Sequence, residues 1–234
     1  MITIERMSLI LNIDTSSENA SICVARDGAG IVLLENADQK DHAAWIHPAI
    51  AKSMKQANCT LNDLKAIAVT AGPGSYTGLR VGMSTAKGLC YALNIPLVTE
   101  NTLRVMALAT KQTFNDLYQQ KDTLFCPMLD ARRMEVFTAL FNTDLEEVMP
   151  SSAIVLDEDS FLDHLAKCKI IFSGNGSKKM QQLVKDPRAI FAQIHHSAEQ
   201  LSFLSNKKFV IQQFDDIAYA EPLYLKEFYT VSKK

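Results

Sequence analysis

The sequence lacks a hydrophobic run long enough to cross a membrane, and it has no surplus of charge of one sign. Spanning a bilayer takes about 20 consecutive apolar residues, and no stretch of the 234 residues approaches that length. The apolar core and cleavage site of a secretory signal are also missing. With 24 basic and 26 acidic residues the formal net charge is -2, too even for strong binding of nucleic acid by the chain alone. We therefore expect a cytoplasmic protein with no membrane partner, which would reach RNA only through another protein.

Cysteine and histidine pairs at metal-ligand spacing are missing as well. The five cysteines are widely spaced, and neither Cys-x-x-Cys nor His-Glu-x-x-His occurs. An odd number of separated thiols in apolar surroundings is typical of reduced core residues. His42 and His47 are five residues apart and would not share a helix face, and His195-His196 fits no recognisable pattern. The sequence thus predicts no disulfide and no metal site.

What the sequence does have is a repeated order of elements. Hydrophobic residues make up 47% of the chain, enough for substantial cores. Three strand-like runs, a helix, a strand, a glycine turn and a second helix occupy residues 8–93, and a similar order recurs weakly over residues 124–184. This repetition predicts two related lobes rather than one long sheet.

The most informative stretch is an apolar strand, residues 64–70, that runs into a glycine-rich turn and a helix. Four glycines between positions 72 and 82 imply unusual backbone angles or the close approach of another backbone. Ser75 or Thr77 could cap the helix, which would suit an anion, but tight packing is the favoured interpretation. The turn is not a P-loop, because Gly78 is followed by Leu79-Arg80 and not by the Lys-Ser or Lys-Thr pair of a P-loop. It also fails as a dinucleotide fingerprint, because a meander and a helix precede it.

Two acids end equivalent apolar runs. Asp14 is followed by Thr15 and Ser16, and Asp130 by Ala-Arg-Arg. In duplicated lobes the two carboxylates would face each other and could hold Mg²⁺ against nucleotide phosphates. The alternative is that each acid accepts hydrogen bonds from its own turn. Likewise, the arginines at positions 132 and 133 could clamp an anion, although a local salt bridge is favoured.

Two predicted helices, residues 41–58 and 75–93, carry more apolar or small-residue surface than a surface helix needs. One stripe is sufficient for packing on a single neighbour. The second helix has small residues every four positions beside its apolar stripe. We therefore expect both helices to form a partner interface, and the candidate residues are Trp45, Ile46, Ala49, Ile50, Gly78, Gly82, Met83 and Ala86.

Five segments together resemble the TsaB (YeaZ) family: Leu11–Ser16, Ala71–Gly82, Ala86–Leu89, Leu129–Arg133 and Glu221–Leu225. The resemblance implies an α/β ASKHA (actin/Hsp70/sugar-kinase-like) fold. Its two RNase-H-like lobes would each have a mixed sheet flanked by helices. Residues 1–105 would form the N-terminal lobe, with 217–234 returning to it, and residues 106–216 the C-terminal lobe.

The resemblance also implies a function in tRNA modification. TsaB is the non-catalytic companion of TsaD, which with the ATPase TsaE forms threonylcarbamoyladenosine at position 37 of tRNAs that read ANN codons. TsaD carries two metal-binding histidines in Asn-His-Leu-Glu-Gly-His after the shared glycine run. Thr102 and Met106 stand at these positions here, and neither can replace imidazole.

By this resemblance the chain would have no catalytic residue, cofactor or metal of its own. It would pair with TsaD, join TsaE in a ternary complex, form a homodimer when alone and meet tRNA only through the complex. Gly82→Arg is then expected to block pairing with TsaD without unfolding the lobe. Met134 stands where the family commonly has glycine. The alternative function is an ASKHA-type ATP-dependent phosphotransferase or ATPase that uses Asp14 and Asp130.

Overall fold

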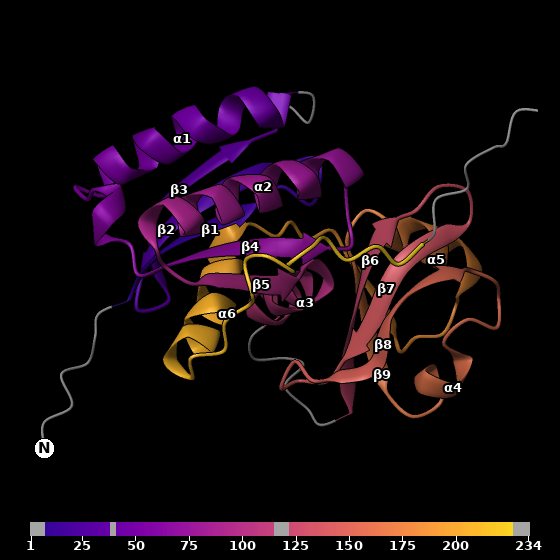
Figure 1. The fold of residues 1–234 in the computed structure, drawn as a ribbon. Helices are drawn as coiled ribbons and strands as arrows, with labels where there is room; N and C mark the ends of the chain where they lie inside the picture. The colour runs from indigo at the N-terminus through magenta and orange to yellow at the C-terminus, as the bar shows by residue number, and fades with distance from the viewer. Residues whose placement is uncertain (1–7, 38–40, 115–121, 227–234) are drawn as a thin grey trace, which may run out of the picture. The chain divides into compact units, whose positions relative to one another are not determined.

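The computed structural model describes residues 8–37, 41–114 and 122–226, which divide into two compact units (Figure 1). The first unit comprises Met1–Val105 and His195–Pro222, and the second comprises Met106–Ile194 and Leu223–Lys234. Helix α3 (Thr102–Thr113) begins in the first unit and continues into the second.

A five-stranded mixed sheet forms the centre of the first unit, in the order β3-β2-β1-β4-β5. Its strands are β1 (Leu9–Asp14), β2 (Ala20–Arg26), β3 (Ala29–Asn36), β4 (Ala66–Gly72) and β5 (Leu97–Asn101). The first three strands form an antiparallel meander, and β4 and β5 extend the sheet in parallel with β1. Every residue of β1 is buried, so its end is a protected position.

Helices cover both faces of this sheet (Figure 1). On one face α1 (His42–Gln56) packs on β2 and β3, α2 (Tyr76–Leu93) packs on β4, and the two helices contact each other. On the other face α6 (Ala198–Val210) contacts all five strands. A short 3-10 turn, η2 (Leu61–Asp63), leads into β4. The main apolar core lies between the sheet and the α1–α2 pair.

The second unit repeats the strand order with its own five-stranded sheet, β8-β7-β6-β9-β10. The elements are β6 (Thr123–Asp130), β7 (Glu135–Phe141), β8 (Glu147–Val155), α4 (Leu162–Leu165), β9 (Lys169–Ser173), α5 (Ser177–Leu183) and β10 (Ala189–Ala192). Again a meander is followed by two parallel strands. The duplicated mixed sheet of the ASKHA fold is therefore confirmed.

The chain returns to the first unit earlier than the sequence predicts. Residues 195–216 were expected in the second lobe, whereas the segment His195–Pro222 belongs to the first unit. The physical reason is that α6 buries its apolar side, including Leu201 and Leu204, on the first sheet. The last described residues, 223–226, group with the second unit.

Candidate functional site

Asp14 ends the central strand of the first sheet and is 1% exposed. Its Oδ1 atom accepts hydrogen bonds from Ser16 N at 3.0 Å, Ser16 Oγ at 2.7 Å and Thr70 Oγ1 at 2.9 Å. Thr70 lies on β4, the parallel neighbour of β1. The carboxylate therefore fastens the turn after β1 to the adjacent strand, as the turn-bonding alternative predicts.

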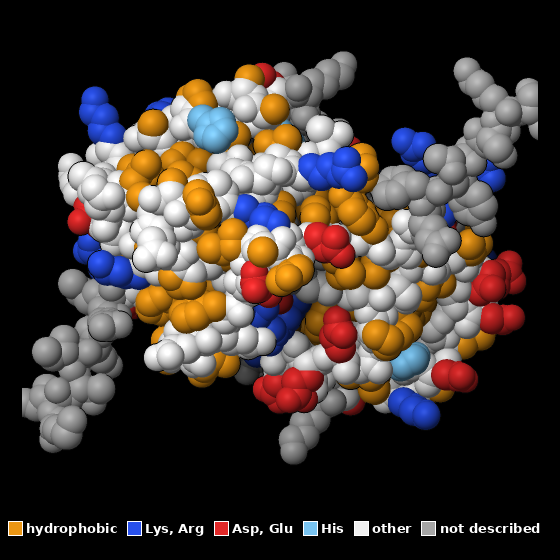
Figure 2. All heavy atoms as spheres, in the orientation of Figure 1, with side chains coloured by type: hydrophobic (Ala, Val, Ile, Leu, Met, Phe, Trp, Pro, Cys, Tyr) orange, Lys and Arg blue, Asp and Glu red, His pale blue; other side chains and the backbone are white. Residues whose placement is uncertain are grey.

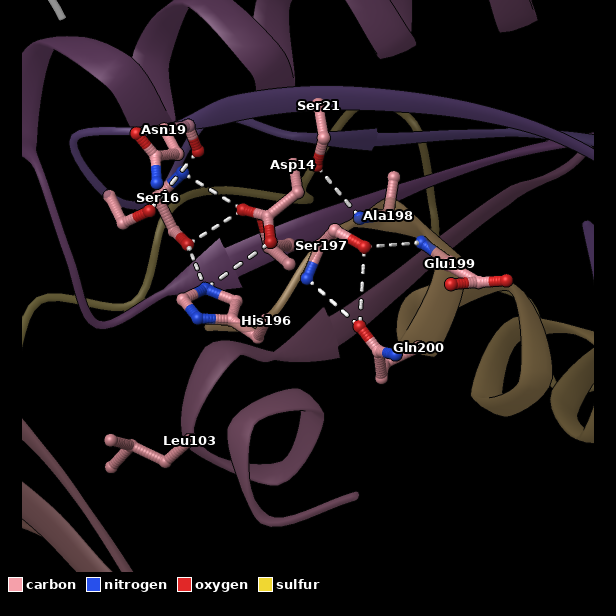
Figure 3. Close-up of polar contacts among 12 residues, drawn as sticks. Asp14, Ser16, Asn19, Ser21, Leu103, His196, Ser197, Ala198, Glu199 and Gln200 are labelled. Atoms are coloured by element: carbon pink, nitrogen blue, oxygen red, sulfur yellow. Dashed lines mark hydrogen bonds and ion pairs between the residues drawn. The ribbon is translucent and has the colours of Figure 1, made fainter. Parts of the chain in front are cut away.

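The second oxygen of Asp14 is different, because it is buried without a hydrogen-bond partner. His196 lies beside it, with Nε2 3.3 Å from Asp14 Oδ2 and 3.4 Å from Ser16 Oγ (Figure 3). The histidine is itself 9% exposed. Both side chains are therefore buried together at the end of β1.

The start of α6 holds His196 in place. The capping box of Ser197 and Gln200 fixes the first turn of the helix, and Ala198 N donates to Ser21 Oγ on β2 at 2.8 Å (Figure 3). The histidine pair had no pattern that pointed to a site. The signal available was the Ser-x-x-Gln capping box directly after it, which marks a helix start but not its neighbours.

The glycine turn packs tightly against the turn after β1. A Cβ at Gly74 would lie 2.2 Å from Ser16 O, and one at Gly78 would lie 2.0 Å from Thr15 O. The contacts are bonded as well as close, because Ser75 N donates to Ser16 O at 2.7 Å and Thr15 Oγ1 donates to Gly78 O at 2.6 Å. The carbonyl oxygens of Thr15 and Ser16 thus lie against the N-terminus of α2. The glycines of this turn therefore serve tight packing. Ser75 also caps α2, accepting from Gly78 N.

The predicted partner residues require a correction, because they are covered by the chain's own fold. Seven of the eight are buried, and the eighth, Trp45, is partly buried. The side chains of Ile46, Ala49, Ile50, Met83 and Ala86 belong to the core of the first unit. Gly78 and Gly82 are buried, and a Cβ at Gly82 would lie 2.3 Å from Thr15 Oγ1. The apolar surplus arises because each helix packs on the sheet and on its neighbouring helix. Gly82→Arg would therefore disrupt the lobe itself.

The outward side of α1 and α2 combines small residues with larger ones, which include the exposed Lys52, Arg80 and Tyr91. Exposed positions on α1 include Ala44, His47, Pro48 and Ala51, and those on α2 include Thr77, Ser84 and Gly88. Nothing lies within 4 Å of a Cβ built at Gly88. Figure 2 shows hydrophobic side chains and a histidine over this part of the surface. We call these seven residues the outer helix face.

Asp130 ends the central strand of the second sheet, in a more exposed setting. Its side chain is 44% exposed, and its Oδ1 accepts from Lys179 Nζ at 2.9 Å and from Arg132 N at 2.6 Å. Partial burial raises the pKa of this carboxyl, but the Lys179 hydrogen bond, the Arg132 N–H and the lysine charge together hold the pKa below its ordinary value. Asp130 is thus an acid bonded by its own turn and by a lysine of α5.

The resemblance leads us to compare Thr102 and Met106, in α3, with two histidines of TsaD. Thr102 and Met106 are buried, and the Thr102 hydroxyl has no hydrogen-bond partner in the described chain. Among the described residues, no group of three or more His, Cys, Asp or Glu side chains could hold a metal ion. Burial raises the pKa of the Cys23, Cys90 and Cys126 thiols to about 12, as expected of unreactive core cysteines. All five cysteines are free thiols.

No helix in the described ranges is long and apolar enough to cross a membrane.

Comparison with known proteins places these observations in a family. The family model for TsaD, tRNA N6-adenosine threonylcarbamoyltransferase, matches residues 17–225. The tRNA threonylcarbamoyladenosine biosynthesis protein TsaB of Bacillus subtilis is 30% identical over 210 residues, covering 85% of this chain and 87% of the relative. YeaZ from Pseudomonas aeruginosa superposes with a TM-score of 0.79 at 22% identity, over 94% of this chain and 100% of that one.

Proposed function

Since the chain belongs to the TsaD family and, within it, to the TsaB (YeaZ) proteins, we propose that it is a non-catalytic subunit for tRNA modification. It takes part in the biosynthesis of threonylcarbamoyladenosine at position 37 of tRNAs that read ANN codons. TsaD supplies the transferase site, TsaE supplies the ATPase, and this chain is the scaffold on which TsaD becomes active.

The observation that carries this proposal is the closed glycine turn. In a phosphate-binding turn, backbone N–H groups at a helix N-terminus point at the ligand. Here Ser16 O accepts from Ser75 N at 2.7 Å, and the glycines leave just enough room for the Thr15 and Ser16 backbone. An anion would have to displace these carbonyls. The turn therefore supports a structural role better than nucleotide chemistry.

A second argument comes from the start of α3. Metal-dependent transfer needs imidazole or carboxylate donors, and Thr102 and Met106 offer a hydroxyl and a thioether. Arg104 lies between them and pairs with Glu100 at 3.5 Å. Glu100 also meets Lys208 of α6 at 3.2 Å. The ion pairs of Glu100 with Arg104 and Lys208 connect α3 and α6 to β5. These residues therefore do not form a set of metal ligands.

TsaD would bind on the outer helix face. Its exposed alanines and glycine leave room for another helix to approach closely. The same face would form the homodimer when TsaD is absent, so the two assemblies would exclude each other. TsaE would join once the TsaD pair has formed.

Reconstitution tests the function. TsaD and TsaE are mixed with unmodified tRNA, ATP and the enzyme that makes the threonylcarbamoyl adenylate, with and without this chain. We expect modified adenosine to form at an appreciable rate only when the chain is present. Equal rates in its absence would show that the chain is not a required subunit.

A matched pair of variants tests the interface. Ala51 lies on the outer helix face, and Ala166 lies exposed just after α4 in the second unit. We expect Ala51→Arg to abolish co-elution with TsaD in size-exclusion chromatography, whereas Ala166→Arg should leave it intact. Thermal unfolding of both variants checks that each is folded. An undisturbed complex with folded Ala51→Arg would refute the assignment of this face.

The buried Asp14 oxygen favours one alternative function. Its Oδ2 atom accepts no hydrogen bond among the described residues and has only the His196 ring recorded beside it, at 3.3 Å, so a bound cation could satisfy it, as in an ASKHA-type phosphotransferase or ATPase that uses Asp14 and Asp130. That alternative predicts Mg²⁺-dependent ATP binding by the isolated chain that weakens in Asp14→Asn. Titration calorimetry with no heat of ATP binding to the wild-type chain would eliminate it.

A further inference from the structure

The turn between β6 and β7 presents two arginines in a restrained conformation. Arg132 has φ 72° and Arg133 has φ 46°, a region that side chains other than glycine enter only at a cost. Three bonds fix the turn: Arg132 N donates to Asp130 Oδ1 at 2.6 Å, Ala131 N to Glu135 O at 3.1 Å, and Glu135 N to Arg132 O at 3.0 Å. Such strain persists where the surrounding structure imposes it, and it clusters at functional sites.

Met134, at the position where the family resemblance leads us to expect glycine, is bonded into the same part of the chain. Its carbonyl accepts from Leu156 N at 2.8 Å, which ties the turn to the residue after β8. The positive φ angles fall on the arginines and not on Met134. The backbone at position 134 therefore does not require glycine.

The acids nearest to the arginines are already paired with lysines. Asp130 is 2.9 Å from Lys179, and Glu135 is 2.5 Å from Lys226. In the part of the chain that the structure describes, neither Arg132 nor Arg133 forms an ion pair, and both are exposed. The local salt bridge that the sequence favours is therefore made by the lysines, and two guanidinium groups remain uncompensated.

We propose that the β6–β7 turn is a contact site for the phosphodiester backbone of RNA, with Arg132 and Arg133 as its two cationic anchors. Guanidinium groups match phosphate oxygens in a bidentate geometry. The lysine pairs keep Asp130 and Glu135 from competing for the arginines. This inference rests on the proposed function, because the RNA is the tRNA that the complex modifies.

The charge of the whole chain limits how strong the contact is. A formal net charge of -2 gives no long-range attraction for RNA, so the turn acts once TsaD has brought the tRNA near. Two contacts to single-stranded or duplex phosphates change the slope of log affinity against log salt by about 1.5. Between 50 and 200 mM salt this amounts to about a tenfold difference in affinity.

The experiment measures the KM for unmodified tRNA in the reconstituted complex at several salt concentrations. Arg132→Ala/Arg133→Ala removes the charges, and Arg132→Gly/Arg133→Gly removes them while suiting the positive φ angles. We expect both variants to raise the KM for tRNA severalfold at low salt, with kcat unchanged, and to reduce the salt slope by about 1.5. Arg132→Lys/Arg133→Lys retains the charges and should retain most of the slope.

The matched control is Lys167→Ala/Lys185→Ala, which removes the same charge from exposed lysines beyond the C-terminal ends of α4 and α5. It should leave the KM and the slope close to wild type. A glycine variant that is folded and has the wild-type salt slope would overturn the inference. If omitting the wild-type chain does not slow modification, the proposed function fails instead, so the two failures are distinguishable.

Discussion

Asp14 and Asp130 occupy the same place in two sheets of the same strand order, but their surroundings differ. Asp14 is almost fully buried and bonds to Thr70 and the turn after β1. Asp130 is half exposed and bonds to a lysine and to the turn before β7. The comparison teaches that the duplicated topology fixes the position of the acid at the end of the central strand. The residues that follow the acid determine how buried it is and what it bonds to. Thr15 and Ser16, which follow Asp14, are buried against it, whereas Arg132 and Arg133, which follow Asp130, are exposed.

The glycine turns that follow the neighbouring strands extend the comparison. In the first unit Gly78 and Gly74 fit against the backbone of residues 15 and 16. In the second unit a Cβ at Gly176 would lie 3.0 Å from the Leu129 carbonyl carbon, and Gly176 N donates to Met128 O at 3.0 Å. Both turns therefore pack on the end of the central strand, and the first fits more tightly.

The largest expected effect comes from adding one methyl group at the tighter turn. Gly78→Ala would place a Cβ 2.0 Å from Thr15 O, and overpacking against backbone costs about 3 kcal/mol or more of unfolding free energy. Gly176→Ala should cost less. Gly88→Ala, on the open side of the same helix, should stabilise by about 0.5–1 kcal/mol. Urea unfolding compares the three, and similar values for Gly78→Ala and Gly88→Ala would contradict the packing described.

Removing each acid tests the difference in burial. Asp14→Ala would leave the Ser16 and Thr70 hydroxyls and the Ser16 N–H without their acceptor, at a cost of about 3 kcal/mol. Asp130→Ala removes a half-exposed ion pair and should cost less than about 1 kcal/mol. Thermal and urea unfolding measure both variants. Equal losses would mean that the two acids are equally important for folding.

The adjacent histidines provide a smaller test within the first unit. His196→Ala removes the imidazole whose Nε2 lies 3.3 Å from Asp14 Oδ2, and we expect a loss of about 1–2 kcal/mol. His195 is exposed, so His195→Ala is the control and should change stability by less than about 0.5 kcal/mol. The loss in His196→Ala should disappear in an Asp14→Ala background, which a double-mutant cycle measures.

The smallest effect concerns the pH dependence of Asp130. Its pKa is lowered in the folded protein from the ordinary value of 3.8, so the folded state binds this proton less readily than the unfolded state. The carboxyl therefore contributes stability above pH 3.8, and the contribution is lost as the pH falls through the folded pKa. Lys179→Met should raise the pKa of Asp130, which NMR titration of the carboxyl carbon measures. An unchanged pKa would show that the lysine does not act on it.

Much of this fold could be predicted from local patterns. The two meanders, the cap at Ser75 and the closely packed glycine turn follow from strand periodicity and from glycine spacing, which depend on neighbours in sequence. Strand β10 escaped prediction because Ala-Ile-Phe-Ala is short and gains its stability by pairing with β9.

The candidate site was less predictable because its contacts join distant segments. His196 meets Ser16 across 180 positions of the chain, and no local pattern encodes that pairing. The apolar surplus of α1 and α2 predicts an external partner, whereas these side chains pack in the core of the first unit. A helix between a sheet and a second helix buries two sides within one lobe, so composition alone could not identify the neighbour.

The return of His195–Pro222 to the first unit has a consequence for synthesis of the protein. A ribosome adds about 5–20 residues per second, so α6 emerges roughly 5–20 s after the strands that it covers. Until then the face with Asn12 and Cys23 has no α6 to cover it. A fragment that stops at residue 105 would keep this uncovered face permanently, which makes the first unit a poor candidate for separate expression.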